Sequence, residues 1–310
     1  MGRKSLEKQI NNKYNSLGRY GVSKYQIKNN IAQEIPTKSR FEIKTPYIHS
    51  KETMKTYKDV GSRFADYLIK TGNFKRYDNL KDITVEHAKE YLEYRRDYDC
   101  VSPFTLKMER SALSKLLDDK IEVELPQRER ENIFRSRNEV DNDRHFSLKN
   151  NHDLIVLAKA CGFRRSDLEK AHTSDFKERD GHLYVLIDKS KGGRNRIAPV
   201  LPKYEKEVKR IIKERESLGK DKLVDKVHSK MDVHSFRREY AQELYEQIKE
   251  NKILRNEYLK LYQQRSENIK SDMYHSRGDT NFHGLRDDIY VVSQALGHNR
   301  LDVSVNHYLK

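Results

Sequence analysis

The stretch LGHNRLDVSVNHYLK closes the chain at residues 296–310 and decides how the rest of the sequence is interpreted. Gly297 is expected to end an apolar helix, so that His298 emerges at a helix terminus. Tyr308 follows ten residues after His298, on a short helix expected one or two turns further along. Tyrosine is among the side chains that form covalent intermediates, and histidine is the commonest side chain for moving protons.

A first arginine motif, CGFRRSDL, occupies residues 161–168. It places Arg164 in a turn just after a helix stop, with Ser166 positioned to cap the helix that follows. The planar guanidinium group matches the geometry of phosphate oxygens and stays charged at any working pH. The alternative for such an arginine is an ordinary surface charge, and the later motifs argue against it.

A second arginine motif, HSFR, occupies residues 234–237. Its histidine and arginine are three residues apart and therefore lie on one face of a helix. The string HxxR is weak by itself, because HGLR at 283–286 repeats it. We reject that second copy, since only fifteen residues separate its histidine from His298, too few for the helices expected between the two motifs.

Taken in this order, the three motifs resemble those of the tyrosine recombinases, a family of site-specific integrases. The pattern Gly, apolar, Arg, any, Ser, acid, Leu of that family is matched by GFRRSDL, and LGH is followed by a tyrosine at the ten-residue spacing. The resemblance implies a mainly α fold with a small antiparallel β-sheet. It also implies an N-terminal helical core-binding domain, a C-terminal catalytic domain, and Asp167 as a buried structural partner.

The same resemblance calls for a lysine at the tip of a β-hairpin. Counting back six residues from Ile197 in the strand RIAPV gives Lys191. Lys189, Arg194 and Arg196 are nearby alternatives. A hairpin tip suits a flexible side chain that moves into a groove and gives a proton to a leaving oxygen.

The resemblance also implies a mechanism that needs neither metal nor ATP. Tyr308 would attack the scissile phosphate and leave a 3′-phosphotyrosyl bond with a free 5′-hydroxyl. The two arginines and His298 would neutralise charge on the non-bridging oxygens, Lys191 would protonate the 5′-oxygen, and His234 would accept or orient the tyrosine proton. The implied catalytic residues are Arg164, Lys191, His234, Arg237, His298 and Tyr308.

Composition bounds the class of partner. The chain has 310 residues, a formal net charge of +15 and a pI near 9.5, which favour a polyanion such as DNA. Two cysteines without metal spacing argue against a disulfide scaffold or a zinc site. Neither a signal peptide nor a membrane span is evident, so we expect a cytoplasmic protein. Abundant Lys, Asn, Ile and Tyr suit an AT-rich bacterial genome, so we expect a bacterial protein that is nucleoid-associated when bound to DNA.

The expected organisation follows composition and periodicity. Residues 1–45 are predicted to be a basic arm with some helical content, 46–125 a helical core DNA-binding domain, and 126–145 a charged linker. The catalytic domain is predicted over 146–310, with a charged insertion at about 248–282 that forms an extra hairpin or a solvated excursion.

Local signals place several elements more closely. Helices are predicted from Ser50 to a stop at Gly72, after a Thr84 cap, and after Ser102 with Pro103 in the first turn. HLYVLID and RIAPV are predicted to pair as a hairpin around Gly192-Gly193.

The expected partner is double-stranded DNA at specific sites, with a homotetramer assembled on the DNA and room for accessory proteins that bend it. Because only two residues follow Tyr308, either the subunits are coupled without exchange of a C-terminal helix or the sequence is trimmed at this end. The alternatives are a type IB topoisomerase, which relaxes DNA with little sequence preference, and a non-catalytic DNA-binding protein on the same fold. An RNA-binding module is disfavoured, because no aromatic-rich strand motif is present.

Overall fold

Two units, Met1–Phe134 and Arg135–Lys310, make up the chain in the computed structural model. The side chains of Lys189 and Arg194 are not described, and residues 128–145 of the predicted linker also lie outside the described part. The structure describes residues 4–35, 43–127, 146–190, 194–262, 272–276, 281–298 and 300–309.

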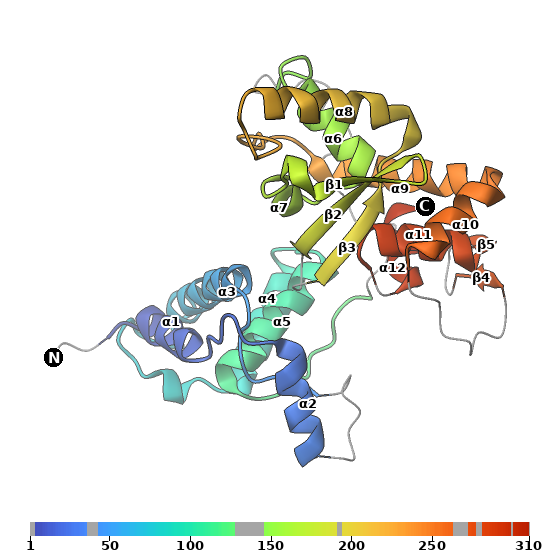
Figure 1. Cartoon of the computed structure of the whole chain (residues 1–310). Helices are drawn as coiled ribbons and strands as arrows, with labels where there is room; N and C mark the ends of the chain where they lie inside the picture. The colour runs from blue at the N-terminus through green and yellow to red at the C-terminus, as the bar shows by residue number, and fades with distance from the viewer. Residues whose placement is uncertain are drawn as a thin grey trace. The chain divides into compact units, whose positions relative to one another are not determined.

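In the described residues of the first unit, all named secondary-structure elements are helices (Figure 1). The predicted caps are present: the Ser50 hydroxyl accepts from the Thr53 N–H at 3.0 Å, and Pro103 opens the last helix after its cap, Ser102. The elements are α1 (Leu6–Ser16), α2 (Lys24–Glu34), α3 (Lys51–Lys70), η1 (Leu80–Asp82), α4 (Val85–Asp97) and α5 (Pro103–Leu117).

Helix α1 corrects the predicted arm at 1–45, because it belongs to the core of this unit. Leu6, Ile10 and Tyr14 repeat at four-residue spacing and are fully buried, and the Tyr14 hydroxyl donates to the carbonyl of Ala112 in α5 at 3.0 Å. A Cβ at Gly61 of α3 would lie 2.6 Å from the Ile10 side chain, so glycine permits the close approach of α1 and α3. In contrast, α2 buries no residue.

The second unit is mainly helical with small antiparallel sheets, so the predicted fold class is confirmed. Figure 1 shows β1, β2 and β3 side by side in that order. The elements are α6 (His152–Cys161), α7 (Arg165–Leu168), η2 (Thr173–Asp175), β1 (Phe176–Arg179), β2 (His182–Ser190), β3 (Arg194–Pro199), α8 (Pro202–Ser217), α9 (Val233–Glu250), α10 (Lys252–Lys260), β4 (Met273–His275), β5 (His283–Leu285), α11 (Arg286–Ala295) and α12 (Leu301–Tyr308).

The predicted hairpin is the β2–β3 pair. Its antiparallel register sets Tyr184 opposite Pro199 and Ile187 opposite Arg196, with an irregularity between Ile187 and Ser190. Because strand side chains alternate between faces, Arg196 lies on the same face as the buried Ala198. The hairpin therefore carries a charged side chain into the interior of the unit.

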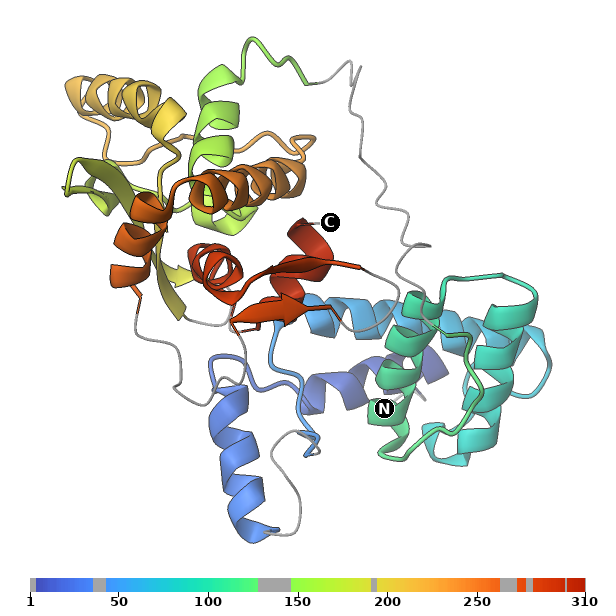
Figure 2. The ribbon, with the colours of Figure 1, turned by 90° about the vertical axis from the view of Figure 1, so that its right-hand side faces the viewer.

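The segment predicted as an insertion, about 248–282, is partly built into the core. Its helix α10 packs against α9 and α11, with Leu254 and Tyr258 buried, so a purely solvated excursion is wrong for these residues. Its strand β4 pairs antiparallel with β5, which forms a second small sheet. The sequence left an extra hairpin open for this segment but did not specify these strands. Figure 2 shows this pair beside α11.

Packing in the core of the second unit fixes the ends of helices α6 and α11. Helix α6 packs against α8 and α9, and α11 packs against α9, α12 and strand β3. Tyr240 of α9 is fully buried and donates to the Pro199 carbonyl at 2.8 Å, which ties that helix to the sheet. Within the described ranges, the structure holds no helix with the length and apolar character needed to cross a membrane.

Candidate functional site

Two helices end at left-handed glycines on one side of the second unit. Gly162 follows α6 with a φ of +57°, and Gly297 follows the last turn of α11 with a φ of +65°. A Cβ at Gly162 would lie 2.3 Å from the Tyr240 ring, and one at Gly297 would lie 2.8 Å from the Arg196 side chain. Glycine at both positions lets the chain turn sharply into the sequence motifs that follow.

Two of the predicted arginines converge on the carbonyls at these helix ends. Arg164 donates from Nη2 to the Leu296 carbonyl at 2.9 Å and from Nη1 to Ser190 Oγ at 2.6 Å. Arg237, from α9, donates to the same Leu296 carbonyl at 2.5 Å and to the Gly162 carbonyl. Arg237 is 1% exposed and Arg164 is half-buried. The ends of α6 and α11 therefore hold these two cations close together.

A third guanidinium group, Arg196 of β3, lies in the same network. It donates to the carbonyls of Gly162, at 3.2 Å, and of Ala295. It also forms an ion pair with Asp167 at 3.1 Å. Burial, followed by the charge of Arg237, lowers the pKa of Arg196 to about 10, so this side chain remains charged at neutral pH.

Helix dipoles account for this packing of like charges. The carbonyls at a helix C-terminus carry partial negative charge and stabilise cations beside them. The carbonyls of Gly162, Ala295 and Leu296 all come from such ends. Three cations are therefore balanced mainly by main-chain oxygens, which leaves a net positive charge.

Asp167 is the one carboxylate in this network among the described residues. It is buried, and it accepts from Ser190 Oγ at 3.0 Å and from the Arg164 main-chain N–H at 3.2 Å. Burial raises its pKa, but the charge and hydrogen bond of Arg196 outweigh burial, and the net pKa is lowered. The prediction that Ser166 caps α7 is wrong: Arg164 is the cap residue, and Asp167 accepts from its N–H.

Tyr308 lies against this cluster at the end of α12. Its hydroxyl accepts from Arg237 Nε at 3.4 Å, and it is 5% exposed. The ring centroid of Tyr308 lies 5.3 Å from that of His298 and 5.4 Å from that of the exposed His234. The phenol, both histidines and a guanidinium group are thus brought together from α9, α12 and the turn after α11.

A pocket of about 760 Å³ opens over this group. Among the described residues that line it, Asp232 is the one acid, and its carboxylate accepts from the Ser235 N–H and so caps α9. A pocket with this lining fits a small anionic group such as a phosphodiester. The site residues that line it are Arg164, His234, Arg237, His298 and Tyr308.

The comparisons with known proteins concern the whole chain. No protein-family model and no curated protein matches this sequence. Among solved structures, the XerH site-specific recombinase bound to palindromic difH substrate, a post-cleavage complex, has a TM-score of 0.52 and 17% identity, covering 97% of this chain and 90% of that one. The pre-cleavage complex of XerH with difH gives a TM-score of 0.51 and 16% identity over 99% and 94% of the two chains. This chain has the tyrosine-recombinase fold.

Within the tyrosine-recombinase fold, the hairpin lysine is the predicted site residue that the structure does not describe. Lys191 lies outside the described residues, and so do the side chains of Lys189 and Arg194. Arg196 was left open as an alternative, but it is buried, bound to Asp167, and absent from the pocket lining. Arg196 is therefore ruled out as the mobile hairpin donor.

Sequence reasoning missed Arg196 as a buried member of the cluster. The available signal was alternation in RIAPV, which puts Arg196 on the inward face with Ala198 and Val200. An inward arginine demands acceptors, and the buried Asp167 and the helix-end carbonyls supply them. Ser190 was missed as well, and no pattern in the sequence marks it.

Candidate metal ligands lie elsewhere on this tyrosine-recombinase fold. Within the described residues, His152, Asp153 and Glu207 are the one group whose ligand atoms approach within 4.8 Å. Arg210 donates to Asp153 at 2.6 Å and to Glu207 at 3.0 Å, so a guanidinium group already balances both carboxylates. We assign no metal to this group.

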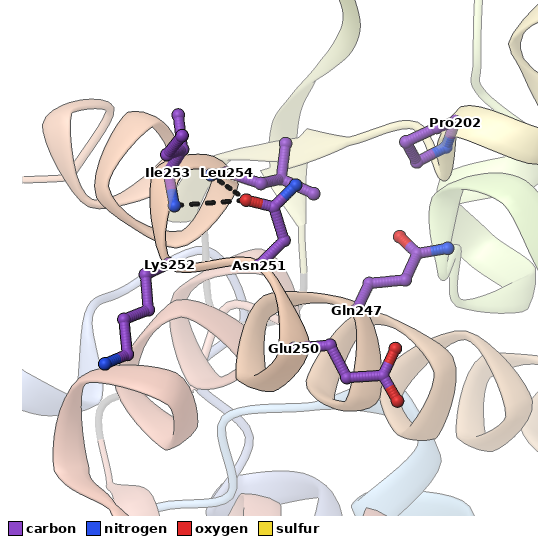
Figure 3. Close-up of a pocket in the computed structure, with 7 residues that line it drawn as sticks. All are labelled: Pro202, Gln247, Glu250, Asn251, Lys252, Ile253 and Leu254. Carbon is purple, nitrogen blue, oxygen red and sulfur yellow. Dashed lines mark hydrogen bonds between the residues drawn. The ribbon is translucent and has the colours of Figure 1, made fainter.

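Another pocket, of about 660 Å³, lies where α9 meets α10. Figure 3 shows the Asn251 side-chain oxygen accepting from the N–H groups of Ile253 and Leu254, both at 3.1 Å, which caps α10. Among the described residues, its lining holds one acid and one lysine but no histidine, tyrosine or arginine. It therefore has no counterpart there to Tyr308 or to the two site arginines of the first pocket.

The positive charges of Arg164, Arg196 and Arg237 affect the pKa of His298. Burial, and then the charges of Arg237 and Arg164, lower the pKa of His298 to about 3. In the unfolded chain the same histidine titrates near pH 6.5, to within about a unit. His298 is therefore neutral in the folded protein at neutral pH.

We expect the protein to lose stability as the pH falls below about 6.5, because the unfolded chain then binds a proton that folded His298 does not. By pH 5 this linkage should cost about 1 kcal/mol, roughly half the full value, since the ring is partly solvated. Urea unfolding at pH 7 and pH 5 measures the change in the free energy of unfolding between the two pH values. This change, the pH effect, should be smaller in His298→Gln than in the wild-type protein. An equal pH effect in His298→Gln would contradict the assignment.

Proposed function

We propose that this protein is a site-specific DNA recombinase that breaks and rejoins DNA through a covalent 3′-phosphotyrosyl link, without metal or ATP. The observation that carries the proposal is the Tyr308 hydroxyl, placed 3.4 Å from Arg237 in a pocket lined by a second arginine and two histidines. The tyrosine-recombinase fold supports the proposal as well.

Tyr308 is proposed as the nucleophile. Its oxygen attacks the scissile phosphorus, a new O–P bond forms, and the bond to the 5′-oxygen breaks. A free tyrosine ionises only near pH ~10, so the phenol needs cations beside it to react at neutral pH. Arg237 supplies the nearest positive charge. Its Nε donates to the Tyr308 hydroxyl, and its guanidinium carbon lies 5.6 Å from the centroid of the Tyr308 ring.

Arg164 and Arg237 are proposed to bind the non-bridging phosphate oxygens. Their positions are fixed before substrate arrives, because both donate to the Leu296 carbonyl. Preorganised charge of this kind is usually the largest contribution to catalysis, and removal of one donor costs about 2.7–4 kcal/mol in known cases. The buried Arg196 adds to the positive potential at the pocket, although its side chain does not line the pocket.

Three proton-handling roles complete the proposal. His298 donates a hydrogen bond to a phosphate oxygen, and His234, whose ring lies 5.4 Å from that of Tyr308, accepts or orients the phenol proton. Lys191, which the sequence predicts at a hairpin tip, is proposed to protonate the departing 5′-oxygen. In the second half of the reaction a 5′-hydroxyl of another strand attacks the phosphotyrosine and releases Tyr308.

The proposed partner is double-stranded DNA at specific sites, bound by a homotetramer that assembles on the DNA. A net charge of +15 supports binding of the phosphate backbone, and this binding should weaken steeply with salt. The XerH complexes contain difH substrate, which concerns that protein. For this chain we propose strand exchange between two duplexes in the bacterial cytoplasm, with room for DNA-bending helpers.

The test is capture of the covalent intermediate. We expect the purified protein, incubated with sheared DNA of its source cell in EDTA, to form complexes that survive denaturation by SDS. Sequencing of the captured fragments should give a short shared site, and nicked duplexes carrying that site should accumulate adduct, because the 5′ fragment diffuses away. The adduct should map to Tyr308 by mass spectrometry.

The same experiment separates the alternatives. Adducts spread over all sequences, together with relaxation of any supercoiled plasmid, would indicate a type IB topoisomerase instead of a recombinase. Binding to duplex DNA without adduct on any fragment would leave a non-catalytic DNA-binding protein. Recombination between two copies of the captured site is the outcome expected here.

A further inference from the structure

Two fully buried serines lie on either side of His298. Ser293 of α11 fixes the main chain: its hydroxyl donates to the His298 carbonyl at 3.1 Å, and its carbonyl accepts from the His298 N–H at 2.7 Å. Ser304 of α12 instead contacts the ring, with its Oγ 3.2 Å from Nδ1. The two serines are equally buried, but only one of them touches the imidazole.

The Ser304 contact determines which ring nitrogen carries the proton. Among the described residues, Nδ1 of His298 is the one hydrogen-bond partner of Ser304 Oγ. If Nδ1 held the proton and donated to Ser304, the serine hydroxyl hydrogen would be buried without an acceptor, which is unfavourable. The hydroxyl therefore donates, Nδ1 accepts, and the proton of the neutral imidazole sits on Nε2.

The tautomer matters because His298 is neutral in the folded protein. A histidinium ion donates from both nitrogens, whereas a neutral imidazole donates from only one. His298 lines the pocket, and with Nδ1 engaged by Ser304, the remaining nitrogen, Nε2, is the one available there. A phosphate oxygen accepts hydrogen bonds and offers none, so only the Nε2–H form binds it.

We propose that Ser304 is a positioning residue that holds His298 in the Nε2–H tautomer, so that docking of α12 delivers the Tyr308 phenol and prepares the histidine donor together. Ser304 and Tyr308 are four residues apart on α12, hence about one helical turn. The role toward phosphate rests on the proposed function, whereas the tautomer is a property of the free protein. Displacement of α12 would remove both groups in one step.

The tautomer is measured directly by NMR of the full chain labelled with ¹⁵N-histidine. Long-range proton–nitrogen correlations distinguish a protonated from an unprotonated ring nitrogen. For His298 at pH 7 we expect an unprotonated Nδ1 and a protonated Nε2. In Ser304→Ala the two nitrogens should move toward a tautomer average, and the rate of adduct formation on a nicked site should fall about tenfold, the effect of one lost hydrogen bond.

Two variants separate positioning from a general effect on the fold. Ser293→Ala removes an equally buried hydroxyl that contacts only carbonyls, so the His298 tautomer should be unchanged. Ser304→Thr keeps a hydroxyl and should restore both the tautomer and most of the rate. Tyr308→Phe should also keep the tautomer, because α12 stays docked.

A protonated Nδ1 in the wild-type protein would overturn the proposal. So would a Ser304→Ala variant that loses activity while its His298 spectrum is unchanged, since the serine would then act on the fold alone. If the tautomer is as expected but the wild-type protein forms no adduct on any DNA, the proposed function fails while the assignment of the Ser304 hydrogen bond stands.

Discussion

Replacement of Tyr308 by phenylalanine is expected to abolish the covalent protein–DNA adduct while the protein remains folded and bound to DNA. The change removes one oxygen, whose described hydrogen bond is the 3.4 Å contact with Arg237 Nε. The ring itself keeps its packing against His298 and the Arg237 guanidinium group. A phenyl ring has no nucleophilic atom, so the loss should exceed about 1,000-fold, the scale seen when a catalytic nucleophile is removed.

Adduct on a captured, nicked site is measured on a denaturing gel, and binding to the same duplex by gel shift. Tyr204→Phe provides a matched control, because this tyrosine lies on α8 of the same unit and lines neither pocket. It should form adduct at the wild-type rate. Persistence of adduct in Tyr308→Phe would place the nucleophile elsewhere and reject the proposed mechanism.

Replacement of Asp167 by asparagine is expected to destabilise the second unit by about 3–5 kcal/mol, the cost of breaking a buried ion pair from one side. Arg196 would then be a buried cation whose remaining acceptors are the carbonyls of Gly162 and Ala295. Amide hydrogen exchange in β2 and β3 measures the free energy of unfolding of this unit by itself, which avoids any assumption that the two units unfold together.

Asp225→Asn is the matched control for the buried carboxylate. Asp225 accepts from both Nη atoms of Arg215 and from Lys220, but its side chain is 65% exposed. Loss of an exposed ion pair should leave exchange in the core strands unchanged. Combining Asp167→Asn with Arg196→Met should recover part of the lost stability, because the orphaned charge is removed. No recovery in the double variant would argue that Asp167 acts through Ser190 or Arg164 instead.

The features that sequence predicted are those encoded within a few residues. A serine before Lys51, a proline at 103 and glycines at 162 and 297 specify helix ends through local backbone preferences, and the structure has those ends. Two short strand-like segments on either side of Gly192-Gly193 were enough to predict the β2–β3 hairpin. The spacing of the arginine, histidine and tyrosine motifs selected five residues that line one pocket.

What sequence did not predict depends on contacts between distant segments. The charged α1 looked like part of an arm, because its apolar stripe has meaning only once α3 and α5 are present to cover it. Arg196 looked like one more cation near a hairpin tip, and only the fold shows Asp167 and two helix ends around it. The β4–β5 pair is too short, at three residues a strand, to be distinguished from a loop by periodicity.

The main-chain support of the two pocket arginines has a consequence for turnover. A guanidinium group neutralised by a carboxylate must shed that counterion before it can hold a phosphate, and must recover it afterwards. Here Arg164 and Arg237 both rest on the peptide oxygen of Leu296, which never leaves. The carboxylate paired with Arg164, Asp167 at 3.8 Å, is itself held in place by Arg196 and Ser190. One nucleic acid strand can therefore replace another while Arg164 and Arg237 keep their positions. No side-chain substitution at position 296 can remove the main-chain oxygen that holds them.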